Sequence, residues 1–237
     1  ITHDNHRTGM DLSEDVPNRE KESHYWAAVY EGDTELISLF LLGDDDTDPE
    51  PGITLELVDA RGLPTMHRLA VIGHLHAIQF LLDEAEADVN QTEAFFGQTP
   101  LHLAATKGHV EVVRQLVRHN ANAEARDKVG GWTPLHAAAR TGQDEVVEAL
   151  LSGAKDGYIN TRGSYGDTAL HRAAYWGHVS TVELLLRHGA DRHCINNDED
   201  DPSAVACKGP NADMFGLAQI QNLLLRASIR SGGHDDL

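Results

Sequence analysis

Cysteine is scarce in this chain of 237 residues, which contains only Cys194 and Cys207. Two cysteines are too few for a disulfide scaffold, and their spacing is not that of a zinc site. We therefore expect a reducing compartment, cytoplasmic or nuclear, and neither a bound metal nor a cofactor.

Positive charge is also scarce, because 19 Lys and Arg stand against 38 Asp and Glu, for a formal net charge of −19. Such a chain repels a phosphate backbone unless its basic residues gather on one face, so we expect no nucleic-acid partner. Apolar runs fall far short of the roughly 18 residues of a membrane span, and residues 1–21 do not resemble a signal peptide. A soluble protein with no membrane partner is expected, and 41% hydrophobic residues suffice for a core.

The sequence does contain an internal repeat. Three strings align with one another: "GQTPLHLAATKGHVEVVRQL" at 97–116, "GWTPLHAAARTGQDEVVEAL" at 131–150 and "GDTALHRAAYWGHVSTVELL" at 166–185. A weaker copy, "PTMHRLAVIGHLHAIQFLL", spans 64–82, and partial copies lie at 24–42 and 200–228. Each copy predicts two short antiparallel helices. In the three aligned strings Thr precedes the first helix, and in two of them Pro is its first residue; Gly ends this helix, and an apolar stripe marks the second. One copy alone cannot bury its apolar face, but stacked copies can.

These strings resemble ankyrin repeats. The resemblance implies an all-α solenoid of about six helix-turn-helix units with finger-like hairpin loops. In the weaker copy Pro64 stands at the usual threonine and Met66 at the usual leucine, which leaves open how its first helix is capped. The predicted segments are an N-terminal tail (1–21), an N-terminal capping repeat (22–58) with an acidic loop (43–52), a degenerate repeat (59–94), three repeats (95–128, 129–163, 164–197), a C-terminal capping repeat (198–228) and a tail (229–237).

Histidine is abundant, with 15 residues, and this invites a metal or catalytic interpretation. Four of the histidines, however, occupy the family's own histidine position, where the imidazole is a hydrogen-bonding strut between neighbouring repeats: His67, His102, His136 and His171. A periodic polar residue that is satisfied inside the stack explains all four, so metal binding is not expected.

Other positions are left free by the repeat framework, and they resemble the recognition positions of the family. They hold six of the 13 aromatic residues together with two basic ones. The predicted partner-binding residues are Phe95, Phe96, Lys107, Trp132, Arg140, Tyr165, Tyr175 and Trp176. They predict a concave groove that is aromatic and locally basic, and that binds an acidic or polar protein or peptide with an aromatic or proline anchor. A small-molecule ligand also stays open.

The second hypothesis is an enzyme, or a small-ligand protein, that uses the same groove. Its acid–base residues would be drawn from Asp167, Tyr175 and His178. The sequence contains no recognisable nucleophile–base pair, phosphate-binding Gly-rich loop or paired-carboxylate motif. We therefore rank the protein-binding module first and leave the enzyme as the alternative.

Overall fold

The computed structural model of the chain describes residues 18–43, 53–210 and 214–231. Across these residues the regular structure is helical, with twelve α-helices, one 3₁₀ helix and no β-strand. The α-helices are α1 (Asn18–Glu31), α2 (Thr34–Leu42), α3 (Thr65–Ile72), α4 (Leu75–Asp83), α5 (Pro100–Lys107), α6 (Val110–Arg118), α7 (Pro134–Thr141), α8 (Asp144–Leu151), α9 (Ala169–Trp176), α10 (Val179–Arg187), α11 (Pro202–Ala206) and α12 (Met214–Ser231), and the 3₁₀ helix is η1 (Tyr158–Asn160). The predicted all-α fold class is confirmed.

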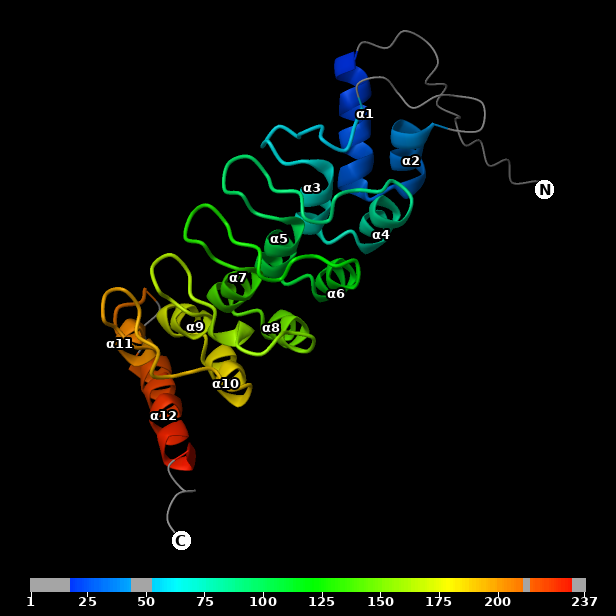
Figure 1. Ribbon diagram of the computed structural model, residues 1–237. Helices are drawn as coiled ribbons and strands as arrows, with labels where there is room; N and C mark the ends of the chain where they lie inside the picture. The colour runs from blue at the N-terminus through cyan, green and yellow to red at the C-terminus, as the bar shows by residue number, and fades with distance from the viewer. Residues whose placement is uncertain (1–17, 44–52, 211–213, 232–237) are drawn as a thin grey trace, which may run out of the picture.

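The helices are paired, and the pairs stack in chain order to form the solenoid (Figure 1). The first helices, α1, α3, α5, α7, α9 and α11, pack one on the next, and the second helices, α2, α4, α6, α8 and α10, form a parallel row that α12 continues. Long loops before α3, α5, α7, α9 and α11 project beyond the first helices, and we call these loops the fingers. The six stacked units of the prediction are confirmed.

The division of the chain into eight segments stays a prediction. α1 begins at Asn18, within the range expected for the N-terminal tail, and α12 runs to Ser231, beyond 228. The acidic loop, apart from Gly43, lies outside the described residues, as do 1–17 and 232–237.

The histidine struts explain how α5, α7 and α9 start and how each of these helices is joined to the next repeat. In α5, His102 Nδ1 accepts the backbone N–H of Thr99 at 3.2 Å and lies 2.9 Å from the Thr99 hydroxyl. The other ring nitrogen, Nε2, donates to the carbonyl of Trp132 in the following finger at 2.9 Å. His136 and His171 make the same set of bonds, and the predicted struts are confirmed.

The weaker copy departs from this arrangement at its cap. Pro64 precedes α3 and offers no side-chain hydrogen bond, so Nδ1 of the buried His67 has no partner among the described residues. His67 Nε2 still lies 3.0 Å from the carbonyl of Gln98. The strut between the repeats is therefore kept, while the capping box is lost.

The core runs the length of the stack rather than collecting at one centre. Leu101, Leu135 and Leu170 each follow the first residue of a first helix and are at most 1% exposed. Small residues at the interfaces, such as Ala104 and Ala138, are fully buried and let successive first helices approach closely. The core thus fixes the spacing of the fingers that it carries.

Candidate functional site

The fingers before α5 and α7 are each held by hydrogen bonds from their own backbone to one carboxylate. Glu93 accepts the N–H groups of Phe95 and Phe96, both at 2.7 Å, and that of Gln98 at 3.0 Å. Asp127 does the same in the next finger, where it accepts from Gly130 and Trp132 at 3.0 Å. These carboxylates are buried and satisfied by backbone donors, so they add little negative charge to the outer surface of the fingers.

Neighbouring fingers are also joined to one another through their backbones. The N–H of Lys128 donates to the carbonyl of Phe96 at 2.8 Å, and that of Ser164 donates to the carbonyl of Gly130 at 2.7 Å. In the last such contact the N–H of Asn197 donates to the carbonyl of Tyr165 at 3.0 Å. The fingers before α5, α7, α9 and α11 therefore form one ordered row rather than separate loops.

Large apolar side chains stand exposed along this row. We define the fingertip row as Phe95, Phe96, Val129, Tyr165 and Ile195, each of which is at least half exposed. Phe95 leans on the preceding finger, because a Cβ built on Gly62 would come within 2.6 Å of its ring. The row brings together three of the predicted binding residues, Phe95, Phe96 and Tyr165.

The remaining predicted aromatics lie deeper, in a cluster with two arginines. The cluster consists of Trp132, Arg140, Arg172, Tyr175 and Trp176. Arg172 stacks over the Trp132 indole, with its guanidinium carbon 4.2 Å from the ring centroid, and Arg140 lies 5.9 Å from the Trp176 ring. Tyr175 and Trp176 meet edge to face at 5.6 Å. Half of the predicted aromatic anchors are thus already packed against side chains of this chain.

Glycines make room for Trp132. A Cβ on Gly130 would come within 2.5 Å of the indole, and one on Gly163 within 2.9 Å. The indole therefore lies against the backbone of two fingers and under Arg172, and it is half-buried. We conclude that Trp132 contributes to the packing between fingers, and its role in binding stays a prediction.

The three candidates for acid–base chemistry lie in the same region, but no hydrogen bond joins any two of them within the described part of the chain. Asp167 is buried and accepts from Asn196 Nδ2 at 2.9 Å and from Arg172 Nη1 at 3.4 Å. His178 Nε2 lies 2.9 Å from the backbone carbonyl of Arg140, so its ring bonds to the preceding repeat. Tyr175 contributes its ring to the cluster around Trp176.

The two basic residues that the sequence singled out lie on successive first helices. Lys107, at the end of α5, is exposed, whereas Arg140, at the end of α7, is half-buried beside Trp176. Arg126 joins two fingers by donating to the carbonyls of Gly131 and Arg162, at 3.1 and 2.7 Å. Exposed positive charge therefore accompanies the fingertip row.

Arg172 is not among the residues that the sequence singled out. The available signal was its position, because Arg172 directly follows the strut His171 as Arg68 follows His67. Asp167, five residues before Arg172, lies on the finger before α9, and Asn196 lies on the finger before α11. No sequence pattern predicts that Asn196 shares Asp167 with Arg172.

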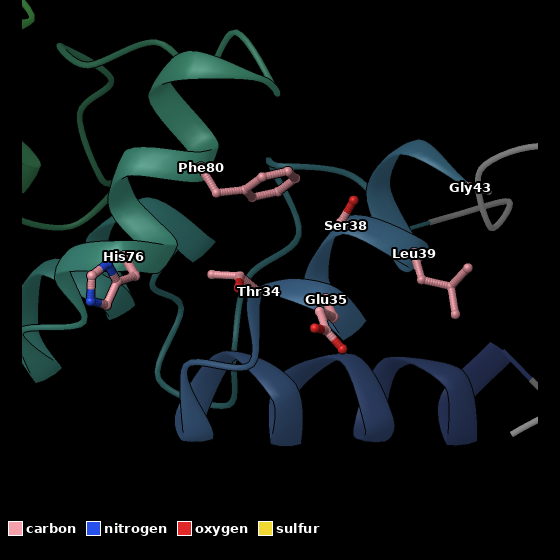
Figure 2. Close-up of a pocket in the computed structure, with 7 residues that line it drawn as sticks. All are labelled: Thr34, Glu35, Ser38, Leu39, Gly43, His76 and Phe80. Atoms are coloured by element: carbon pink, nitrogen blue, oxygen red, sulfur yellow. The ribbon is translucent and has the colours of Figure 1, made fainter. Parts of the chain in front are cut away.

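Two surface depressions lie away from the fingers, between second helices. Figure 2 shows the larger, of about 470 Å³, where Phe80 of α4 points toward Ser38 of α2. The other, of about 310 Å³, is lined by α6, α8 and α10 and carries Asp144, Glu148 and Glu183. None of the predicted site residues lines either depression.

Clusters of potential metal ligands and membrane-spanning helices are both absent from the described residues. No group of three or more His, Cys, Asp or Glu there is arranged to hold a metal ion. Within the same residues, no helix is both long enough and apolar enough to cross a membrane.

Comparison with known proteins gives a consistent family. The family model described as "Ankyrin repeats (3 copies)" matches residues 24–127, 66–162 and 121–197. The chain is 34% identical over 181 residues to "E3 ubiquitin-protein ligase XB3" of Oryza sativa subsp. japonica, which covers 71% of this chain and 38% of that protein. It is 32% identical over 186 residues to "Ankyrin repeat and SOCS box protein 3" of Bos taurus, covering 76% of this chain and 33% of that protein. It is also 32% identical over 208 residues to "B-cell lymphoma 3 protein homolog" of Mus musculus, covering 76% and 45%. The chain spans less than half the length of these relatives.

Proposed function

Because the chain belongs to the ankyrin repeat family, whose repeats generally mediate protein–protein interactions, we propose that it is a module that binds a partner protein on its fingers. The binding surface consists of the fingertip row and the adjoining ends of α5, α7 and α9. The partner is a protein or peptide segment that presents aromatic or proline side chains and acidic groups.

The observation that carries this proposal is the exposure of the fingertip row. Phe96 is 56% exposed and Tyr165 is 58% exposed, although both sit on fingers fixed by backbone hydrogen bonds. Large apolar side chains held outward on a rigid scaffold contribute nothing to the core, and they provide the contacts that dominate protein interfaces.

Charge supports the chemistry of the partner. Arg126 and Lys128 are exposed on the finger that carries Val129, while the finger carboxylates Glu93 and Asp127 are buried and satisfied by backbone N–H groups. The net charge of −19 opposes an acidic partner at long range, but salt screens such repulsion beyond about 8–10 Å. A partner in contact with the row therefore meets positive charge beside Val129, from Arg126 and Lys128, and negative charge beside Ile195, from Asp198 and Glu199.

The binding module is favoured over the acid–base alternative because the three candidate acid–base residues are engaged in structural contacts. Asp167 and His178 are engaged in hydrogen bonds that join neighbouring repeats, and Tyr175 packs on Trp176. The unpaired Cys194 and Cys207 fit a reducing compartment, cytoplasmic or nuclear, which we retain as part of the proposal.

The proposal is tested by selecting peptides that bind the wild-type chain from a displayed library of random 12-residue peptides. Each selected peptide is then measured by calorimetry against a fingertip variant, Phe96→Ala with Tyr165→Ala, and against a matched outer-helix variant, Glu111→Ala with Glu145→Ala. Loss of two aromatic anchors should weaken binding by about 30-fold or more, while the outer-helix variant binds like the wild type. Peptides that bind the fingertip variant as tightly as the wild type would overturn the proposal.

A further inference from the structure

Two arginines occupy the same position of their repeats but differ in how well they are paired. Arg68 in α3 hydrogen-bonds Asp59 through Nε, at 2.6 Å, and also through Nη2. Its guanidinium carbon lies 5.3 Å from the Tyr30 ring, and its side chain is only 5% exposed. Arg68 is therefore a structural arginine with a dedicated carboxylate.

Arg172 in α9 lacks such a partner. Its hydrogen bond to Asp167 joins Nη1 and Oδ2 at 3.4 Å, and Asp167 also accepts from Asn196 at 2.9 Å. Nε of Arg172 is buried and has no hydrogen-bond partner among the described residues. Compared with Arg68, the Arg172 guanidinium therefore has more hydrogen-bond donors left for a second carboxylate.

A second unused donor lies next to it. The indole Nε1 of Trp132 is also buried and lacks a hydrogen-bond partner within the described residues. The Arg172 guanidinium stacks on that same indole at 4.2 Å. Buried donors without acceptors cost stability, and two of them side by side on a candidate binding face indicate that an acceptor belongs there.

The charge around these donors is positive. Arg140 stacks on the neighbouring Trp176, and Asp167 is the carboxylate that pairs with Arg172. Burial, opposed by Asp167, lowers the pKa of the Arg172 guanidinium. An incoming carboxylate would therefore meet a poorly paired cation in partly dehydrated surroundings, where a charge-assisted hydrogen bond is strong.

We propose that Arg172 and Trp132 form a carboxylate subsite that receives an acidic group of the bound partner. The inference rests on the proposed function and adds to it the chemistry of one anchor. Arg172 offers a planar fork that matches a carboxylate, and the Trp132 indole offers a third N–H. Since both donors are shielded in the unbound chain, binding requires a rotamer change of Arg172, and this change gives up the 3.4 Å bond to Asp167 and the present stacking on the Trp132 indole.

Nuclear magnetic resonance of the full chain labelled with ¹⁵N provides a direct test. The Trp132 indole N–H resonance, assigned with Trp132→Phe, is followed during titration with acetyl-tetraglutamate amide. Acetyl-tetraglutamine amide is the neutral control, and acetyl-tetraglutamine with a free C-terminus reports on a terminal carboxylate. We expect a saturable shift with tetraglutamate and none with the neutral peptide, and a shift with the free-acid peptide would extend the subsite to chain termini. Absence of a shift with both carboxylate peptides would overturn the subsite.

Protein variants separate the subsite from general electrostatic attraction. Arg172→Gln and Arg172→Lys should each weaken tetraglutamate binding about tenfold or more, since the second keeps the charge but loses the fork. Arg114→Gln, on the exposed face of α6, is the matched control and should leave the affinity unchanged. The dispersion of the amide spectrum shows that each variant is folded, and equal weakening by Arg114→Gln would refute the subsite.

Failure of the subsite can be told apart from failure of the proposed function. If carboxylates do not bind while selected peptides still depend on Phe96 and Tyr165, the subsite is wrong and the fingertip surface stands. If selected peptides ignore the fingertip variant, the fingertip surface is wrong, and the Trp132 titration still decides by itself whether Arg172 and Trp132 bind a carboxylate.

Discussion

The histidine struts make stability depend on pH, and His136 gives the largest effect. Burial lowers the pKa of this imidazole from its ordinary value of 6.5 to about 4. In the folded chain, Nδ1 accepts from Thr133 and Nε2 donates to the carbonyl of Asp167, so the ring bonds as its neutral form. Above pH 6.5 the ring is neutral in both the folded and the unfolded state, and the strut contributes fully.

Between pH 6.5 and about 4 the unfolded chain binds a proton at this position and the folded chain does not. The free energy of unfolding therefore decreases as the pH is lowered from 6.5 to about 4, by about 3 kcal/mol for His136 alone. Below about pH 4 both states are protonated and the loss stops. Burial also lowers the pKa of His67, His102 and His171, so their contributions have the same sign.

Urea unfolding followed by circular dichroism, at pH 7.5 and at pH 4, measures the effect. His136→Gln is the comparison, because glutamine keeps a hydrogen-bonding side chain but binds no proton in this range. Carboxylates titrate in both proteins, so the difference between the two pH dependences isolates His136. The wild type should lose about 3 kcal/mol more than the variant, and equal losses would refute the reasoning that the strut is held neutral by burial.

Three further predictions concern stability, each measured by urea unfolding at neutral pH. Leu101→Ala should cost about 2–5 kcal/mol through lost burial and the cavity left behind, and a cost below about 1 kcal/mol would contradict its place at the repeat interface. Pro64→Thr should gain about 1 kcal/mol, because a threonine cap gives the orphaned Nδ1 of His67 a partner, and an unchanged stability would contradict this. Trp132→Ala should cost about 2 kcal/mol through lost packing under Arg172, whereas Phe96→Ala should change stability by less than about 0.5 kcal/mol, and equal costs would contradict the distinction between cluster and fingertip.

Much of the fold follows from the sequence because each repeat carries its own local signals. The Thr99-Pro100 pair at the start of α5, Gly108 at its end and the apolar stripe of α6 each act within a few residues. Because these signals recur at the same positions of each repeat, they indicate that the repeats stack, since only neighbouring copies can bury the apolar stripes. The departure at Pro64 was visible as well, because it replaces a residue whose hydroxyl has a known task.

The site was harder to predict, because exposure depends on residues in other repeats. Phe96 and Trp132 both occupy positions that the framework leaves free, yet one stands at a fingertip and the other lies under a guanidinium. The difference arises from Gly163, on the finger before α9, and Arg172, in α9, which create the space and the cover for the indole. Such contacts have no periodic sequence pattern. The sequence therefore predicted which residues lie in the binding region better than it predicted which of them are exposed.

Hydrogen–deuterium exchange of the wild-type chain, with and without a selected peptide, tests most directly the claim that the fingers are the binding surface. Bound peptide should slow exchange in the fingers, at 95–98, 128–132 and 164–167, and at the ends of α5, α7 and α9. The second helices α6, α8 and α10 should exchange at the same rate in both states. Protection confined to the second helices, with the fingers unchanged, would contradict the account.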